Sequence, residues 1–371
     1  MPSIIKALGI TLSLPPVVIG KTHTVNYIGR KFSLLDFLGN EMRRRISPDC
    51  RVFFDVFAGT GVVGKHFKQQ GFRVVANDIQ YYAYCLNRAY LGLNATPRFA
   101  ELPLERQGTD SRLESVLIHL NRLPGIEGFV FKNYCPDGAQ GRMYFTNVNG
   151  LRCDAIRTEI ENWWESGLLT EGEYFYLLAT LIDGMDRVAN TASVYAAYLK
   201  QFKGTARKPL QLNPIPLVWS QYKHKAFNEN GSDLIGRVHC DVLYMDPPYN
   251  QRQYCTNYHV LETIARYDRP KVYGITGLRP HDDQKSDFCR KNHALPTLNA
   301  MVRETLARYV FLSYNSEGIM SKNDILDTLS QYGHVEVVSH DHTRFRADQD
   351  RDNRVYKANR VEEYLFCLEK D

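Results

Sequence analysis

Short apolar runs alternate with stretches of helical periodicity along the first hundred residues. Two runs, 51–57 (RVFFDVF) and 72–77 (FRVVAN), are rich in branched and aromatic residues and are typical of buried strands. Around them, apolar residues recur at helical spacing over 32–46, 62–70 and 81–91. A strand, a glycine-rich loop, a helix, a second strand and a second helix, in this order, predict the opening of a parallel α/β sheet.

The pattern changes after about residue 95 and returns to strands after about residue 225. Helical patterns dominate the intervening stretch and are strongest at 152–166 and 173–200. The proline-bearing residues 208–217 predict a linker that returns to the sheet. Buried-strand patterns then recur at 240–245, 309–314, 334–338 and 364–368.

These patterns and the chain length together predict two lobes. A chain of 371 residues is longer than a usual single domain, and its 44% of hydrophobic residues is enough for a sizeable core. The predicted fold class is α/β, with a mostly helical inserted domain. Residues 1–95 and 226–371 are expected to form the α/β domain, and residues 96–225 the insertion.

The composition excludes several classes of protein. No run of about 20 apolar residues is present, so we expect no transmembrane helix and no membrane partner. Residues 7–20 are interrupted by Pro15 and Pro16, which makes them a poor signal peptide and favours an N-terminal arm. The eight cysteines are scattered without a CxxC pair, which argues against a zinc site or a disulfide framework and indicates a reducing cytoplasm. We therefore expect a cytoplasmic protein without a metal.

The positive charges are distributed unevenly. The net charge is only +5, yet residues 187–228 contain no Asp or Glu. The basic residues of this stretch are Arg187, Lys200, Lys203, Arg207, Lys208, Lys223 and Lys225. Five aromatic residues lie between them, so the stretch is suited to follow a polyanion, with cations near phosphates and rings available to stack. The alternative is a helix with one apolar and one solvated basic side.

A glycine loop follows the first predicted strand. Gly59, Gly61 and Gly64 form a GxGxxG pattern, which allows a tight turn and the approach of a ligand to backbone N–H groups. Asp78 ends the next strand, where a carboxylate can accept hydrogen bonds from ribose hydroxyls. The pair fits NAD and S-adenosylmethionine equally well. A tight strand–helix turn with a helix-capping Asp is the structural alternative.

The tetrad DPPY, residues 246–249, follows directly after the predicted strand 240–245. The prolines fix the backbone, so that Asp246 and the carbonyl of Pro247 can present two acceptors to a planar amine. Tyr249 supplies a ring for a base taken out of its stack. A fixed carboxylate also stabilises positive charge that builds on an amine attacking a methyl sulfonium. A rigid turn is the alternative, which the presence of the glycine loop disfavours.

With these motifs the sequence resembles the N6-adenine-specific DNA methyltransferases of the alpha, or Dam-like, motif order. Residues 26–31 (NYIGRK) resemble the upstream motif of that family, residues 57–61 its FxGxG loop, and residues 246–249 its catalytic tetrad. The resemblance implies a Rossmann-like S-adenosylmethionine-dependent methyltransferase fold. The residues that it implies for cofactor binding are Tyr27, Lys31, Phe57, Gly59, Gly61, Asp78, Asn230 and Asp246. Those that it implies for catalysis are Asp246, Pro247, Pro248 and Tyr249.

Three further stretches, 250–254, 312–318 and 361–366, extend the resemblance to methylases of the restriction–modification type. In this family the segment before the catalytic strand usually carries target recognition, so the insertion is expected to bind double-stranded DNA. The residues expected to contact DNA are Lys200, Lys203, Arg207, Lys208, Lys223, Lys225 and Arg252.

The predicted function is methylation of the N6 amino group of a flipped adenine in duplex DNA. An amino-methyltransferase acting on cytosine N4, on adenine in RNA or on a protein amide remains an alternative. An NAD-dependent oxidoreductase leaves the tetrad unexplained, and a catalytically dead binding module does not need Asp246, Tyr249, Lys31 and Asp78 together. The protein is expected in the cytoplasm of a bacterial, phage-infected or archaeal cell, near the nucleoid. We expect a monomer or weak dimer, with a restriction endonuclease as its companion.

Overall fold

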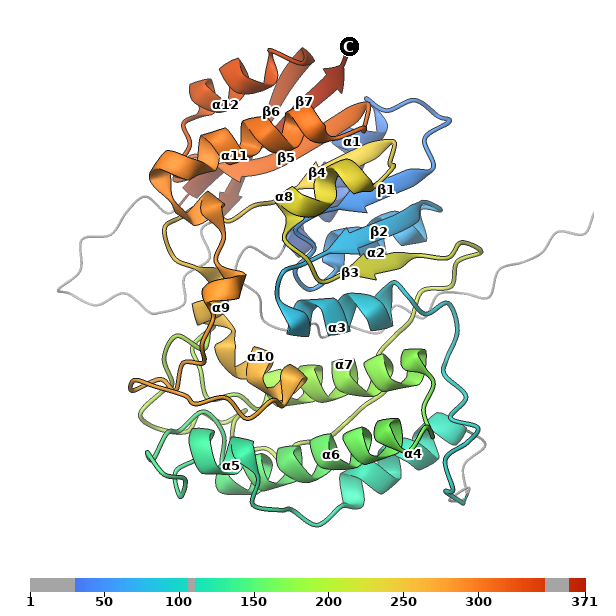
Figure 1. Ribbon diagram of the computed structural model, residues 1–371, viewed down its shortest axis with the longest axis vertical. Coiled ribbons are helices and arrows are strands. Elements are labelled where there is room, and N and C mark those ends of the chain that lie inside the picture. Colours follow the sequence, from blue (N-terminus) through green and yellow to red (C-terminus); the bar gives the residue numbers. More distant parts are fainter. Residues whose placement is uncertain (1–30, 106–110, 344–359) are drawn as a thin grey trace, which may run out of the picture.

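The structure is a computed structural model that describes residues 31–105, 111–343 and 360–371. Its centre is a seven-stranded sheet in the order β3-β2-β1-β4-β5-β7-β6, drawn in the upper half of Figure 1. The strands, in that order, are β3 (Lys225–Phe227), β2 (Arg73–Asn77), β1 (Val52–Asp55), β4 (Val242–Met245), β5 (Tyr309–Asn315), β7 (Arg360–Lys370) and β6 (Gly333–Thr343). Strand β7 runs antiparallel to β5 and β6, and the other pairs are parallel. The predicted Rossmann-like α/β fold is confirmed.

Helices cover both faces of the sheet. One face packs on α1 (Leu35–Arg43) and α2 (Val62–Gln69), and Phe53 and Val74 of the strands belong to their shared core. The other face packs on α8 (Gly231–Leu234), α11 (Lys291–Glu304) and α12 (Lys322–Leu329). The central strands are buried on both faces, which explains why they read as continuous apolar runs. The short helical turns are η1 (Lys31–Leu34), η2 (Ile235–Arg237), η3 (Asp282–Gln284) and η4 (Asp287–Cys289).

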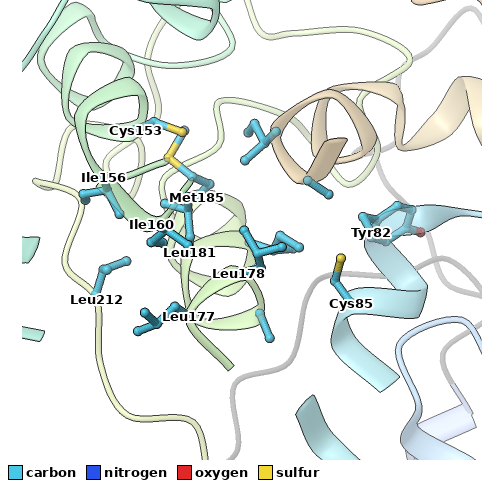
Figure 2. Close-up of a cluster of buried hydrophobic side chains, with 14 of the residues drawn as sticks. Tyr82, Cys85, Cys153, Ile156, Ile160, Leu177, Leu178, Leu181, Met185 and Leu212 are labelled. Carbon is cyan, nitrogen blue, oxygen red and sulfur yellow. The ribbon is translucent and has the colours of Figure 1, made fainter. Parts of the chain in front are cut away.

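A helical lobe lies at one end of the sheet (Figure 1). It contains α4 (Arg112–Arg122), α5 (Phe129–Tyr134), α6 (Asn147–Glu165) and α7 (Glu171–Arg187). Two helices from outside the predicted insertion share its core: α3 (Tyr81–Tyr90) and α10 (His259–Arg266), the latter preceded by α9 (Tyr254–Asn257). In Figure 2, Tyr82 and Cys85 of α3 belong to the same apolar core as Leu178 of α7. The apolar core of the lobe therefore continues into the segments that follow the glycine loop and the tetrad.

The structure corrects the prediction of a single helix over 173–200. Helix α7 begins at a capping box, in which Thr170 and Glu173 satisfy each other's backbone N–H groups, and it ends at Arg187. Beyond it, Asn190 donates its amide to the carbonyls of Met143 and Leu199, and it accepts the N–H of Lys203. Asparagine competes in this way with helical hydrogen bonds, so the chain leaves the helix.

The remaining predicted elements match the observed ones to within four residues, except at the start of α6 and at the end of β6, which extends to Thr343, five residues beyond the predicted end at 338. Helix α6 begins at Asn147, five residues before the predicted start at 152, because Thr146 caps it and accepts the N–H of Asn149. The short edge strand β3 and the helices after the tetrad, α9 to α12, were not predicted. None of the described helices combines the length and apolar character that crossing a bilayer requires.

Candidate active site

A pocket lies where the strand order reverses, between β1 and β4, at the carboxyl ends of the strands. The chain proceeds outward from β1 through β2 to β3, and then returns to place β4 on the other side of β1. This is the position at which open α/β sheets bind their ligands. The pocket encloses about 1130 Å³, including its open mouth. The predicted site residues that line it are Lys31, Phe57, Gly59, Asp78, Asn230, Asp246, Pro248 and Tyr249.

Three predicted residues stand apart from that lining. Gly61 begins α2 with a φ of 76°, and a Cβ there would lie 2.7 Å from Oδ1 of Asn87 on α3. Its role is therefore to let the loop pack against α3. Pro247 is buried in the tetrad without lining the pocket. Tyr27 lies outside the described residues.

Asp78 joins the glycine loop to the start of α3. Its Oδ2 accepts the N–H of Gly59 at 2.8 Å, and its Oδ1 accepts the N–H of Gln80 at 2.9 Å. Burial raises the pKa of Asp78 to about 6, although both N–H groups act in the opposite direction. Each carboxylate oxygen has a second lone pair. The residue can therefore hold the loop and still accept hydrogen bonds from ribose hydroxyls.

The acid of the tetrad belongs to a three-residue charge cluster. Lys31 Nζ lies 3.4 Å from Oδ1 of Asp246 and 3.1 Å from Oε2 of Glu363 on β7. Burial disfavours the charge of Lys31, but the two carboxylates raise its pKa above the ordinary value. Burial raises the pKa of Asp246 to about 6, which Lys31 opposes and Glu363 reinforces. The cluster holds an ammonium beside the tetrad and carries a net negative charge when all three groups are ionised.

A second buried acid, Asp55, lies at the end of β1. Its side chain is 1% exposed, and within the part of the chain that the structure describes its Oδ1 has no hydrogen-bond partner. Burial, followed by the charges of Asp246 and Asp78, raises its pKa well above the ordinary value. An unpaired buried acceptor in the wall of a pocket is a position for a donor on a ligand. Three acids and one lysine around one pocket suit a ligand with positive charge.

The wall opposite the glycine loop is built by residues 284–288, which sequence reasoning did not assign. The side-chain amide of Gln253 donates to the carbonyl of Ser286 at 3.0 Å and accepts the N–H of Ser286 at 2.8 Å. Phe288 meets the ring of Phe57 edge to face, with centroids 5.4 Å apart. The loop after the tetrad is thus fixed to the opposite wall by a two-point bridge.

The loop after β5 also holds the tetrad, through a hydrogen bond to the backbone of the tetrad. The carbonyl of Tyr249 accepts the N–H of Ile319 at 2.9 Å. Tyr249 is half-buried and lines the pocket. A strand end that holds an acid and an aromatic ring, a glycine loop and a second acid at the next strand end all meet in one pocket.

Comparison with known proteins identifies this arrangement. Residues 27–328 match the family described as D12 class N6 adenine-specific DNA methyltransferase. The chain belongs to this family. The match includes the glycine loop, the helical lobe and the tetrad, so it covers most of the D12 class methyltransferase described here.

Curated relatives of this methyltransferase are named Type II methyltransferases or modification methylases. The Type II methyltransferase M.NlaIII of Neisseria lactamica is 40% identical over 348 residues, which are 93% of this chain and 99% of that protein. M.CviAII of Paramecium bursaria Chlorella virus 1 is 36% identical over 350 residues, or 93% of this chain and 98% of the relative. M.FokI of Planomicrobium okeanokoites is 36% identical over 350 residues, and the chain spans only 53% of its length.

Two functional candidates of the methyltransferase were missed by sequence reasoning. Glu363 lies in the stretch 361–366 that resembles the family, and the only signal for it was its position there, as the second of two adjacent acids just before the predicted strand 364–368. Asp55 ends the first strand and precedes the glycine loop, so it was visible as a polar residue at the carboxyl end of a buried strand. Neither signal shows that the side chain faces the pocket, because that depends on the order of the strands.

The predicted DNA-contacting residues of the methyltransferase fall into separate parts of the fold. Lys200, Arg207 and Lys208 are exposed in the segment after α7, whereas Lys203 donates its ammonium to the carbonyl of Thr191 at 2.7 Å. Lys223 and Lys225 are exposed just before and at the amino end of β3. Arg252 is exposed in the loop after the tetrad.

Proposed function

We propose that this methyltransferase transfers the methyl group of S-adenosylmethionine to N6 of an adenine that is rotated out of duplex DNA into the pocket. The observation that carries the proposal is the shared pocket of the glycine loop, Asp78, the tetrad and the Lys31–Asp246–Glu363 cluster. S-adenosylmethionine, when bound, supplies an electrophilic methyl group on a sulfonium. We assign Asp78 to the ribose of the cofactor. We assign Asp55 and the neighbouring acids of the pocket to the positively charged groups of the cofactor.

Asp246 is assigned to the target amine as a fixed hydrogen-bond acceptor, together with the carbonyl of Pro247, which is itself outside the lining but stands between the two lining residues Asp246 and Pro248. Tyr249 is assigned to the face of the rotated base, because it is the aromatic residue of the tetrad and lines the pocket. Positive charge develops on N6 during transfer, and the carboxylate of Asp246 stabilises it. With a pKa of about 6, the same carboxylate can accept the proton that N6 loses and pass it to water.

Asn230 is assigned to the adenine of the cofactor with one restriction. Its Oδ1 accepts the N–H of Ser232 at 3.0 Å and caps helix α8. The amide nitrogen is then the atom left for a ligand. Phe57, Gly59 and Lys31 complete the proposed binding surface, and no metal ion is required. Among the described residues, no three His, Cys, Asp or Glu side chains are grouped as metal ligands would be.

The test uses isotope-labelled S-adenosylmethionine and unmethylated duplex DNA, followed by digestion to nucleosides and mass spectrometry. Labelled N6-methyladenine supports the proposal. Labelled cytosine, or label only when RNA replaces DNA, would overturn the acceptor while leaving the fold and family in place. The Asp246→Ala protein serves as the matched control and should transfer no label while it still binds DNA.

The restriction–modification relatives also suggest a companion. We infer that a restriction endonuclease cleaves the same sequence that this protein methylates. Plasmid DNA from cells that express the methyltransferase should be methylated at every copy of one short sequence, because incomplete protection would expose the DNA to cleavage. Sequencing that detects methylated bases gives both the sequence and the fraction of modified sites.

A further inference from the structure

A hairpin in the loop between α10 and η3 carries an unusually exposed apolar residue. Tyr273 and Leu278 form an antiparallel bridge with two hydrogen bonds of 2.9 Å, and Gly274 and Gly277 turn the chain between them with φ values of 67° and 68°. Ile275 at the tip is 83% exposed, more than any other large hydrophobic side chain among the described residues. Its neighbour Tyr273 is 47% exposed.

Buried side chains hold the carbonyl groups of this tip. Arg142, only 4% exposed, donates to the carbonyls of Gly274 and Ile275 at 2.9 Å each. The next two carbonyls, of Thr276 and Gly277, lie 3.0 Å from Nε2 of His259 and from the hydroxyl of Tyr134. The carbonyls of an exposed turn ordinarily face water. Here four successive carbonyls contact buried side chains, so Ile275 is exposed to solvent on a fixed backbone.

Gly277, at the base of the tip, packs closely against the buried side chains that bind the tip, which together form a brace. A Cβ at residue 277 would lie 2.9 Å from the ring of Tyr134 and 3.0 Å from Nε of Arg142. The stem of the loop is held by Arg279, which forms two bonds of 3.1 and 2.6 Å to the carboxylate of Asp268. The brace therefore includes side chains of the helical lobe and of the segment after the tetrad.

The same scaffold carries the basic segment that follows α7. The ring of Tyr144 contacts the rings of Tyr134, His259 and Tyr198, with centroids 5.7, 5.9 and 5.0 Å apart. Asn190 binds the carbonyls of Met143 and Leu199 at 2.9 Å each, so one side chain joins the neighbours of Arg142 and Lys200. The exposed hairpin tip and the exposed cations of 200–208 are thus held by one connected set of side chains.

The hairpin also precedes, in the chain, a segment that lines the pocket. Residues 284–288, which follow it, form the wall opposite the glycine loop, and Gln284 donates to the carboxylate of Glu262 at 2.6 Å. Figure 1 shows this orange segment passing beside α9 and α10 between the sheet and the helical lobe. Because the hairpin shares its supporting side chains with the basic segment and precedes the pocket wall in the chain, we expect a partner that contacts both to contact the hairpin as well. Cations near a rigid apolar tip fit duplex DNA, whose phosphates and base stack match the two features.

We propose that Ile275 enters the base stack of duplex DNA beside the target adenine and fills the space that this base leaves when it rotates into the pocket. This inference rests on the proposed function. Apolar side chains inserted between bases offset part of the cost of unstacking. That cost is smallest for a base that lacks a pairing partner. The role of Ile275 should therefore be greatest on a fully paired target and small on an unpaired one.

The experiment compares Ile275→Ala with the wild-type protein on short duplexes that contain the mapped methylation sequence. Single-turnover methylation is measured on a paired duplex and on one with an abasic site opposite the target adenine. Ile275→Ala should be about tenfold slower or more on the paired duplex and within about twofold of wild type on the abasic one. Because the side chain is so exposed, the substitution should leave folding intact.

Two further variants sharpen the result. Leu306→Ala removes another exposed aliphatic side chain, just before the amino end of β5 and hence at the end of the parallel strands away from the pocket, and should behave as wild type. Arg142→Lys keeps the charge but cannot bind the same set of carbonyls, and it should show the defect on the paired duplex that the abasic site relieves. Circular dichroism confirms that each variant is folded.

The outcomes separate the two proposals. A wild-type protein that methylates no adenine would refute the proposed function. If the wild type is active, an Ile275→Ala protein that is unimpaired, or equally slow on both duplexes, would refute the inserted side chain. A change of sedimentation coefficient in Ile275→Ala without a change in methylation would instead assign the tip to a protein contact.

Discussion

At the scale of single residues, Lys31 and Glu363 shift the pKa of Asp246 in opposite directions. Asp246 must be ionised to stabilise charge on the amine, so turnover should fall as the pH drops through its pKa of about 6. Removing the negative charge of Glu363 lowers that pKa, so Glu363→Gln should move the acidic limb of kcat/KM, which reports the free enzyme, to lower pH by roughly 0.5–1 unit. Lys31→Gln should move it to higher pH.

The opposite signs distinguish this electrostatic role from loss of structure, which would reduce kcat without moving the limb in a defined direction. Glu362→Gln is the matched control: its carboxylate accepts the hydroxyl of Tyr364, and neighbouring residues of a strand point to opposite faces. A limb that stays in place in Glu363→Gln would exclude the coupling.

Asp78 gives a second prediction at this scale, for cofactor binding. Asp78→Asn keeps the size of the side chain but places an NH₂ group against the N–H of Gly59 or of Gln80, both of which need an acceptor. The glycine loop should loosen, and the affinity for S-adenosylmethionine in calorimetry should fall about tenfold or more, since losing hydrogen bonds to a charged group costs roughly 1.5–3 kcal/mol. DNA affinity should change little; unchanged cofactor affinity would remove Asp78 from the site.

At the scale of elements, Glu262 of α10 joins the segments on either side of the pocket. Its carboxylate is 1% exposed and accepts the N–H groups of Tyr81 and Tyr82 at the start of α3, at 3.1 and 2.9 Å. It also binds Arg266 and Gln284, each at 2.6 Å. One acid therefore caps α3 and holds the wall that follows the hairpin.

Glu262→Gln should lower the free energy of unfolding by about 2 kcal/mol or more, because at least one buried donor then faces an NH₂ group. Urea denaturation measures the change. Glu304→Gln, at the exposed end of α11 beside Arg303, is the control and should cost well below 1 kcal/mol. If the two substitutions cost the same, the four hydrogen bonds contribute nothing specific.

The helices and strands also show which parts of the fold and site can be predicted from the sequence. The strands before the glycine loop and the tetrad, and the helix after the glycine loop, followed from periodicity, because these strands are buried and the helix is amphipathic. The end of α7 did not, because it depends on Asn190 binding the carbonyl of Met143, 47 residues away. Glu363 escaped assignment for the same reason: its contact with Lys31 spans 332 residues and requires β7 to lie next to β5.

At the scale of the whole molecule, the exposed lysines and arginines of residues 187–228 are divided between two regions. Lys200, Arg207 and Lys208 are exposed on the scaffold that also braces the hairpin, next to the elements around the pocket. Lys223 and Lys225 lie at the amino end of β3, whereas the carboxyl ends of the strands face the pocket. DNA that delivers a base to the pocket should therefore contact the first group.

Salt dependence separates the two groups, because each phosphate contact contributes about 0.9 to the slope of log K against log salt concentration. Replacing Lys200, Arg207 and Lys208 together by Ala should reduce the magnitude of the slope by roughly 2–3. Replacing Lys223 and Lys225 by Ala should leave it nearly unchanged. Fluorescence anisotropy with one labelled duplex at several salt concentrations measures both. A smaller slope in the second variant alone would place the DNA along the β3 edge, and Ile275 would then lie away from the bound duplex.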